Sequence, residues 1–273
     1  MNIKVTEELK KEIIEFYKSK PMSFGCVQKK YNLSFPTVKK ILINEKTYPK
    51  NLVYNPELCE NYFQDINDEY KAYFIGLIIS DGNVFEPTNG IDKQSSISIT
   101  LDNSDKYILE EFKVCVKSNN KIAEDGRGCS QIAVRSNKMA NDLSKYGVIP
   151  RKTLFTYLPK INDEFMPHLI RGILDGDGSI GAHRIKSGRF LHYISFCGTH
   201  KLMEDISEYL TNKLNLKTKP KVYDYKNRHL SEISIRSIDD MVLVGDFLYE
   251  NSNIFLKRKK EKYDNFLSHY NLK

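Results

Sequence analysis

The chain has 273 residues, 40% of them hydrophobic, and a net charge of +7 that comes from 42 basic and 35 acidic residues. This length can hold two or three compact units with their own cores. It contains no apolar run long enough to span a membrane and no N-terminal signal segment, so we expect a cytoplasmic protein without a membrane partner. The five cysteines are scattered and include no CxxC pair, which disfavours a disulfide framework or a zinc site.

Positive charge is concentrated at the two ends of the chain. Residues 1–50 contain eleven lysines and five glutamates, a net charge of +6, and residues 256–273 contain six basic and two acidic residues, a net charge of +4. The middle of the chain therefore carries about −3. Basic ends around a nearly neutral middle favour a polyanionic partner, although a lysine-rich solvated surface gives the same composition.

The N-terminal region predicts a small all-helical domain. Helical spacing of apolar residues predicts helices over residues 6–18 and 24–31, and a third that begins near Ser34. Helices joined by a short turn with an apolar residue in it are typical of a helix-turn-helix. We therefore predict a DNA-binding domain over residues 1–48, followed by a polar, proline-containing linker over residues 49–69. A helical packing domain without a binding role is the alternative.

A nine-residue stretch that occurs twice, at residues 74–82 and 170–178, dominates the rest of the chain. Each copy is an apolar run that ends in Asp-Gly, which predicts a helix that stops at the glycine. The acids, Asp81 and Asp177, then lie in the last helical turn, where they face the negative end of the helix dipole at a cost of roughly 0.3–1 kcal/mol each. An acid placed twice at the unfavourable end of a helix dipole indicates a functional role.

Small residues spaced four apart accompany both acids: Gly76 with Ser80, and Gly172 with Gly176. Because residues i and i+4 lie on one helical face, the two helices can pack closely and bring both carboxylates to the same end. Their mutual repulsion is relieved by a shared divalent cation with oxygen ligands, which is how proteins usually hold Mg²⁺. That arrangement suits metal-assisted phosphodiester cleavage.

Similar elements follow each copy. After the first, the pattern predicts a short strand and a loop over residues 83–87, strands over residues 96–101, 121–123 and 131–135, and helices over residues 104–116 and 137–146. After the second, it predicts strands over residues 179–184, 191–197, 219–225 and 232–236, and helices over residues 201–214 and 238–249. Residues 132–136 also have a counterpart in residues 233–237, which indicates an internal duplication. Each half is therefore an α-β-β-α-β-β-α unit, and the fold class is α+β.

The two stretches resemble the paired signature helices of the LAGLIDADG homing endonucleases, in the form that carries both halves on one polypeptide. Both copies have glycine third, apolar residues fourth and fifth, and Asp-Gly eighth and ninth, with the acids 96 residues apart (177 − 81). The first copy departs from the family at Ile79, where an acid is common, and has Ser80 as its small residue. The resemblance implies tandem pseudo-twofold αββαββα repeats over residues 70–160 and 161–273, the second with a basic C-terminal tail, whose two sheets form a saddle over DNA.

The resemblance also implies a metal site. The family uses the acid at the eighth position for metal binding, which makes Asp81 and Asp177 the expected catalytic metal ligands. Backbone carbonyls near Ser80 and Gly176 would complete the coordination. Asp175 lies two residues before its acid, so on a helix it points elsewhere, and we expect it to be structural.

A basic residue near the metals would stabilise the charge that develops on phosphorus or position water. The family keeps a lysine for this purpose just after the last helix of each half. The matching residues here are Lys152 in the first half and Lys259 in the second, where Lys257 is the alternative. Surface charge that binds phosphate is the competing interpretation of both.

Candidate DNA contacts lie on the third N-terminal helix and on the strands and hairpins of both halves. A two-stranded ribbon can reach base edges in the major groove, and basic side chains contact phosphates. Arg135 and Arg236 are favoured because the repeat places them equivalently. The predicted set is Thr37, Lys39, Lys40, Gln131, Arg135, Arg184, Lys186, Arg189, His192, Lys221, Tyr223, Arg228 and Arg236.

The sequence thus predicts a monomeric, site-specific double-strand DNA endonuclease of the homing type. It would use Mg²⁺, with Mn²⁺ able to substitute, need no protein partner and cut a long asymmetric target. A transcription regulator or an RNA maturase with the same fold is the alternative; such proteins often lose a metal acid, and both acids are present here. An intein endonuclease is disfavoured because we find no splicing segment on either side. Unequal halves are also compatible with an enzyme that nicks one strand.

Overall fold

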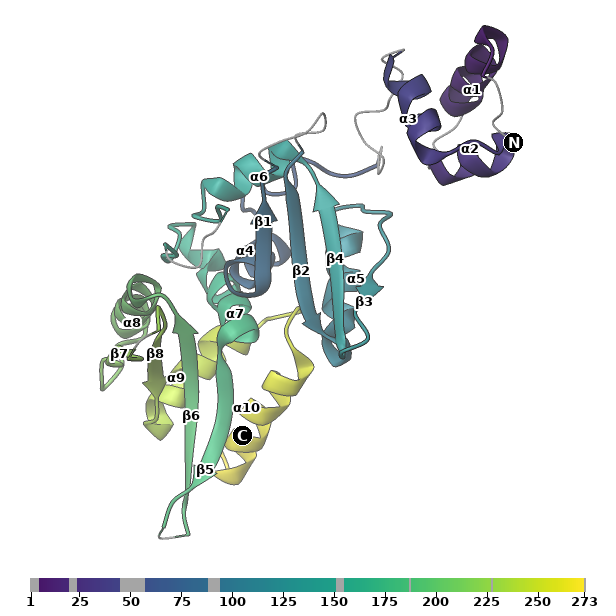
Figure 1. The fold of residues 1–273 in the computed structure, drawn as a ribbon. Helices are drawn as coiled ribbons and strands as arrows, with labels where there is room; N and C mark the ends of the chain where they lie inside the picture. The colour runs from purple at the N-terminus through teal and green to yellow at the C-terminus, as the bar shows by residue number, and fades with distance from the viewer. Residues whose placement is uncertain are drawn as a thin grey trace. The chain divides into compact units, whose positions relative to one another are not determined.

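The computed structural model describes residues 5–19, 24–44, 57–87, 94–150, 155–186, 188–226 and 228–272. The described residues up to 44 form one compact unit, and those from 57 onward form another (Figure 1). Within these ranges, no helix is both long enough and apolar enough to cross a membrane.

The N-terminal unit contains α1 (Glu7–Ser19), α2 (Phe24–Tyr31) and α3 (Phe35–Asn44). Thr6 caps the first of these, since its Oγ1 accepts the N–H of Leu9 at 3.2 Å. Apolar residues at helical spacing on the three helices, together with Leu33 in the turn before α3, give the unit a core of its own. This core comprises Ile13, Ile14, Tyr17, Val27, Leu33, Val38, Ile41 and Leu42. The three helices predicted for this region are confirmed.

The larger unit contains two four-stranded antiparallel sheets, one in each half. The first half comprises α4 (Glu69–Asp81), β1 (Gly82–Phe85), β2 (Ser96–Asp102), η1 (Asn103–Asp105), α5 (Lys106–Cys115), β3 (Ala123–Glu124), β4 (Cys129–Arg135) and α6 (Asn137–Ser144). The second comprises η3 (Asp163–Phe165), α7 (Met166–Asp177), β5 (Ser179–Arg184), β6 (Phe190–Gly198), α8 (His200–Leu214), β7 (Tyr223–Asp224), β8 (Ser231–Ile235) and α9 (Ile238–Tyr249). The strand orders, β1-β2-β4-β3 and β5-β6-β8-β7, correspond. The predicted α-β-β-α-β-β-α order and the α+β class are confirmed.

Each sheet has one buried face and one open face. In the first sheet Ile97 pairs with Val134 and Ile99 with Ile132, and all four side chains are fully buried under the helices. Residues between them, such as Ser98, point to the opposite face because side chains alternate along a strand. The alternation of apolar and polar residues that predicted a half-buried strand therefore corresponds to a sheet whose polar face is not covered by helices.

The larger unit ends in a helix that we did not predict, α10 (Lys257–His269), where we expected a basic tail. Its buried residues Tyr263, Phe266 and Leu267 have the i, i+3, i+4 spacing of a core-facing stripe. The helix packs against β5 (Figure 1). The charged residues that precede this stripe, among them the exposed Lys257, Arg258 and Lys262, made the segment look uniformly polar.

The predicted linker, residues 49–69, lies partly outside the described residues, and its described residues before α4, 57–68, pack against the larger unit. Tyr62 and Phe63 belong to the core of the larger unit, with their rings edge to face at 4.9 Å between centroids. The N–H of Cys59 donates to the carbonyl of Val116 at 2.9 Å, which fixes the segment to the end of α5. Two adjacent aromatic residues in a polar stretch were the signal for this packing.

The centre of the larger unit is the contact between α4 and α7. A Cβ atom at Gly76 would lie 2.0 Å from the carbonyl oxygen of Leu169, and one at Gly172 would lie 2.1 Å from the carbonyl oxygen of Tyr73. Each glycine thus faces the residue three positions before the other, as a pseudo-twofold axis requires. The close approach predicted from the small residues is confirmed, and the two backbones touch.

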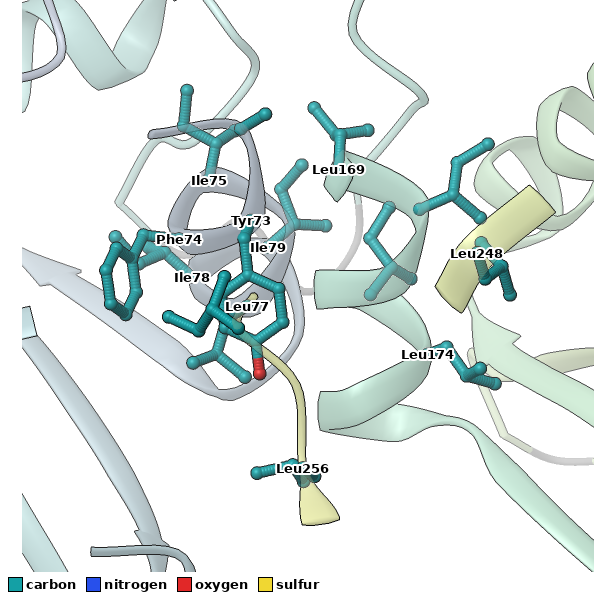
Figure 2. Packing of buried hydrophobic residues seen from close by; sticks show 14 of the residues in the cluster. Tyr73, Phe74, Ile75, Leu77, Ile78, Ile79, Leu169, Leu174, Leu248 and Leu256 are labelled. Atoms are coloured by element: carbon teal, nitrogen blue, oxygen red, sulfur yellow. The ribbon is translucent and has the colours of Figure 1, made fainter. Parts of the chain in front are cut away.

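The large side chains of these helices point away from the contact and into the two halves. Figure 2 shows Phe74 and Ile78 on the side of α4 away from α7, and Leu174 on the far side of α7. Phe74 packs edge to face on Phe112 of α5, with 5.1 Å between ring centroids. A single hydrophobic core therefore runs through both halves and the helix pair between them.

Replacing Gly76 with alanine should destabilise the protein. In a free helix this change stabilises by about 0.5–1 kcal/mol, but here the new methyl group collides with a backbone carbonyl that cannot rotate away. We expect a net loss of about 1–3 kcal/mol, as in other overpacked cores, measured by urea unfolding. Alanine at Asn141, an exposed position of α6, is the control and should change stability by less than about 0.5 kcal/mol. A Gly76→Ala protein as stable as the parent would contradict backbone contact.

Candidate active site

Both signature helices end at an acid followed by a glycine. The N–H of Gly82 donates to the carbonyl of Ile78, and that of Gly178 donates to the carbonyl of Leu174. Both glycines have φ of −88°, which other residues adopt easily, so conformation does not explain them. A Cβ atom would lie 2.5 Å from a side-chain atom of Ile78 or Leu174 respectively. Glycine is therefore needed at both positions because a side chain would not fit where the helix ends and the following strand begins.

The two acids lie at the same end of the helix pair. A Cβ atom at Gly176 would be 1.8 Å from Ser80 Oγ and 3.1 Å from Asp81 Oδ2. The Asp81 carboxylate therefore lies against the residue that precedes Asp177 on the other helix. Asp177 is exposed and Asp81 is half-buried. The structure thus brings together the two acids and the two small residues that the sequence singled out.

Lys259 reaches the end of α7 from the first turn of α10. Its ammonium donates to the carbonyls of Leu174, Asp175 and Gly178 at 2.6, 2.6 and 2.7 Å, and more distantly to that of Gly176 at 3.3 Å. A cation is stabilised there by the negative end of the helix dipole. Burial, with only 3% of the residue exposed, lowers the pKa of Lys259 to about 8, against the opposing effect of nearby carboxylates.

Asp175 occupies a buried polar site behind the helix end. Its Oδ2 accepts the hydroxyl of Tyr73 at 2.9 Å and the N–H of Leu256 at 2.7 Å, while its buried Oδ1 has no hydrogen-bond partner among the described residues. Burial raises the pKa of this carboxyl to about 6. Asp175 thus links α4, α7 and the segment before α10, in agreement with the structural role expected for it.

A second buried polar contact, which the sequence analysis did not predict, lies at the opposite end of the helix pair. Arg171 is fully buried and donates to Glu69 Oε1 of α4 at 2.7 Å. It also donates to the carbonyls of Leu248 at 2.6 Å and Ile254 at 2.8 Å. The available signal was an arginine within the apolar run that precedes the acids, since a buried guanidinium must be paired and hydrogen-bonded.

The lysine predicted for the first half, Lys152, lies outside the described residues, so its role stays a prediction. Lys257, the alternative in the second half, is exposed, and its ammonium lies 4.7 Å from the ring centroid of Tyr107. The lysine that contacts the signature helix is therefore Lys259.

Most predicted DNA contacts of the larger unit are exposed. Gln131 and Arg135 lie on the open face of the first sheet, opposite Thr100 and Ser96, and Gln131 donates to Thr100 Oγ1 at 2.9 Å. In the second half Tyr223 is opposite Glu232, a residue of the open face. The other predicted DNA contacts of the second half that are exposed are Arg184, Lys186, Arg189, Lys221, Arg228 and Arg236.

His192 lies on the helical face of its sheet. Its ring packs on Phe266, His269 and Tyr270 of the C-terminal segment, with 5.1 to 5.4 Å between centroids. It shares this face with the buried Ile194, two positions along β6. The period of two along the strand predicts this orientation, whereas the choice of His192 as a DNA contact rested on its polarity.

In the N-terminal unit, two hydroxyl side chains flank the first residues of α3. Ser34 Oγ lies 2.8 Å from Thr37 Oγ1, and Thr37 is half-buried while Lys40 is exposed. The side chain of Lys39 lies outside the described part of the chain.

No protein-family model matches the chain. Among curated proteins, it is 27% identical over 124 residues to the DNA-directed RNA polymerase subunit Rpo1C of Methanocaldococcus jannaschii, a match that covers 41% of this chain and 13% of that protein. The chain therefore spans only a small part of that relative.

Solved structures match most of the chain. The LAGLIDADG homing endonuclease I-SmaMI bound to cleaved DNA matches with a TM-score of 0.52 and 13% identity, over 75% of this chain and 89% of that one. I-SmaMI bound to uncleaved DNA in the presence of calcium ions matches with a TM-score of 0.53 and 14% identity, over 76% and 93%. The LAGLIDADG meganuclease I-AabMI bound to uncleaved DNA matches with a TM-score of 0.54 and 14% identity, over 76% and 91%. These matches confirm the predicted fold.

Replacing Asp175 with asparagine should change how stability depends on pH. The carboxyl has a pKa of about 6 in the folded chain and an ordinary value of 3.8, so the folded state holds its proton more tightly. Its ionisation therefore costs stability as the pH rises from about 4 to 7, by up to about 3 kcal/mol. Asparagine lacks this cost, so the variant should gain stability relative to the parent over that range. Urea unfolding of both proteins at about pH 4 and pH 7, which measures the free energy of unfolding, tests this.

The exposed Glu250→Gln protein is the matched control for the loss of one carboxylate. A parallel pH dependence of the parent and Asp175→Asn would contradict the assignment of a buried, proton-retaining carboxyl.

Proposed function

We propose that this chain, whose fold is that of the LAGLIDADG homing endonucleases, is a site-specific, Mg²⁺-dependent double-strand DNA endonuclease. The observation that carries the proposal is the convergence of Asp81 and Asp177 at one end of two helices in backbone contact. Solved structures of this fold are bound to DNA, cleaved in one case. The polar open faces of both sheets give this chain a surface of the corresponding kind.

The residues at the helix ends fit a magnesium site. Mg²⁺ is usually held by one or two carboxylates together with substrate phosphates and water. Within the described ranges, no group of three or more histidine, cysteine, aspartate or glutamate side chains is arranged to hold a metal. Two carboxylates beside the main-chain carbonyls near Ser80 and Gly176 are an incomplete oxygen set of the kind that a DNA phosphate would complete.

Each residue has a part in phosphodiester hydrolysis. Bound Mg²⁺ would supply charge neutralisation at phosphorus and an activated water. Asp81 and Asp177 would hold the metal, and Ser80 with Gly176 keeps the two helices close enough for both acids to act at one place. Lys259 supplies a positive charge at the end of α7, where it binds the carbonyls of Asp175 and Gly178 and where both acids favour its protonated form. Lys152 is the residue we propose for the corresponding role in the first half.

The DNA would lie across the open faces of the two sheets. Gln131 and Arg135 would contact it from the first sheet, and Tyr223 and Arg236 from the second. Arginine and glutamine are suited to base edges, and the arginines on the hairpins are suited to phosphates. Because the two open faces carry different residues, we propose a long asymmetric target and a monomeric enzyme.

Incubation of a randomised double-stranded DNA library with the protein and Mg²⁺, followed by sequencing of the ends, tests the proposal. We expect cuts at one long motif with Mg²⁺ or Mn²⁺. Ca²⁺ should support binding, and the Asp81→Asn/Asp177→Asn protein should cut nothing because the metal ligands are lost. The Asp239→Asn protein, changed at an exposed acid of α9, is the control and should cut normally.

Specific DNA binding without cuts under any divalent metal would overturn the nuclease and favour a transcription regulator. Absence of DNA binding together with RNA binding would favour a maturase.

We also propose that the N-terminal unit is a helix-turn-helix that adds affinity for DNA next to the cleavage site. Substitution of both Thr37 and Lys40 by alanine should then weaken binding. It should also reduce the salt dependence of binding by about one counterion, because one phosphate contact is lost. The cleavage position should not change, since it is set by the larger unit. Binding titrations at several salt concentrations measure both effects; unchanged affinity would show that this unit does not touch DNA.

A further inference from the structure

The segment that carries Lys259 is fastened to the opposite half of the protein. Arg258 Nε donates to Asp105 Oδ2 at 2.8 Å, and the Asp105 side chain is only 3% exposed. The hydroxyl of Tyr107 donates to the carbonyl of Phe255 at 2.9 Å and accepts the N–H of Lys257 at 2.6 Å. Asp105 and Tyr107 stand at the start of α5 in the first half. We call these five residues the cross-half clamp.

The clamp holds the residues immediately before Lys259. The N–H of Lys259 donates to the carbonyl of Leu256 at 2.9 Å, which starts the first turn of α10. The neighbouring residues Phe255, Lys257 and Arg258 are all fixed to the first half. A free lysine side chain has about 2 kcal/mol of rotamer entropy to lose when it is fixed in one position. Anchoring the backbone beside it removes part of the remaining freedom and aims the ammonium at the end of α7.

The ammonium in turn fixes the backbone around Asp177. It gathers the carbonyls of Leu174, Asp175 and Gly178, which lie before and after that acid. Without a cation these buried carbonyls would face one another next to two carboxylates at the negative end of a helix dipole. The hydrogen bonds of the Lys259 ammonium go to α7 and Gly178, and the charges of Asp81 and Asp177 both favour its protonated form. A displaced Lys259 therefore disturbs the backbone on both sides of Asp177, whereas Asp81 on α4 is affected through charge.

We propose that Asp105, Tyr107 and Arg258 are positioning residues for Asp177. The first half, through the clamp, holds Lys259 at the end of the second signature helix. Cleavage of the DNA strand served by Asp177 then depends on contacts made by the half that carries Asp81. This inference rests on the proposed nuclease, but the position of Lys259 is testable without any DNA.

The first experiment measures the burial of Lys259. The protein is treated with an amine-reactive acetylating reagent, and the modification rate of each lysine is followed by mass spectrometry, with the exposed Lys262 as internal reference. In the Arg258→Met and Tyr107→Phe proteins we expect Lys259 to react at least about tenfold faster than in the parent, a change of about 1.4 kcal/mol in the opening equilibrium. Continued protection of Lys259 in both would overturn the proposal.

Two further proteins separate the clamp from general loss of stability. Asp105→Asn/Arg258→Met removes the ion pair without leaving a buried charge unpaired, and it should expose Lys259 to the same extent. Lys260→Met removes the neighbouring cation, whose ion pair with Asp264 lies within α10, and it should leave Lys259 protected. Exposure of Lys259 in the Lys260→Met protein would show that any disturbance of α10 suffices and would overturn the specific role of the clamp.

The second experiment follows cleavage of a supercoiled plasmid that carries the target. The Asp177→Asn protein defines which strand depends on Asp177. The clamp variants should bind DNA normally with Ca²⁺ but accumulate nicked circles in Mg²⁺, with the slow strand being that same one. Equal slowing of both strands, or no slowing, would overturn the proposal. If the parent protein cuts no DNA, the proposed function fails, and the acetylation rates still decide whether the clamp positions Lys259.

Discussion

The architecture of the larger unit depends on two helices whose backbones touch. At Gly76 and Gly172 there is no room for any side chain, because each position is filled by a carbonyl of the other helix. Contact at this distance fixes the rotation and the height of α4 against α7. The ends of the helices, and therefore the places of Asp81 and Asp177, follow from that contact. The sheets start at these ends, so their placement follows as well.

The helix pair also explains how charged groups are tolerated in the core. Arg171 and Asp175 lie on the same helix and are both fully buried. Each bonds to a side chain of α4 and to the backbone of the segment after α9. A buried charge is costly unless it is paired and hydrogen-bonded, so these groups tolerate one arrangement of three chain segments and exclude others. Their counterparts in the first motif, Ile75 and Ile79, are apolar, so this specificity is one-sided.

Much of this arrangement was predictable because its signals are local. Three signals each depend on residues a few positions apart: the repeated Asp-Gly, the small residues four apart and the alternation along the strands. They predicted the positions of the acids, the helix contact and the sheets. The features that were missed depend on residues far away in the chain. The stripe of α10 is short and local, but the strand that covers it, β5, lies far away in the sequence, and the partner of Arg171 is Glu69, 102 residues earlier. The orientation of His192 was available from the strand period and was overlooked.

The segment at the end of each half also packs against the other half. Residues after α9 are fastened to α5, as described above, and residues after α6 are fastened to the second half, where Thr199 Oγ1 donates to the carbonyl of Thr156 at 2.6 Å and the N–H of Leu158 donates to Asp205 at 3.2 Å. Each half therefore completes the surface of the other. Although the sequence is a tandem repeat, each repeat depends on contacts that the other supplies, so we expect the larger unit to unfold as one cooperative unit.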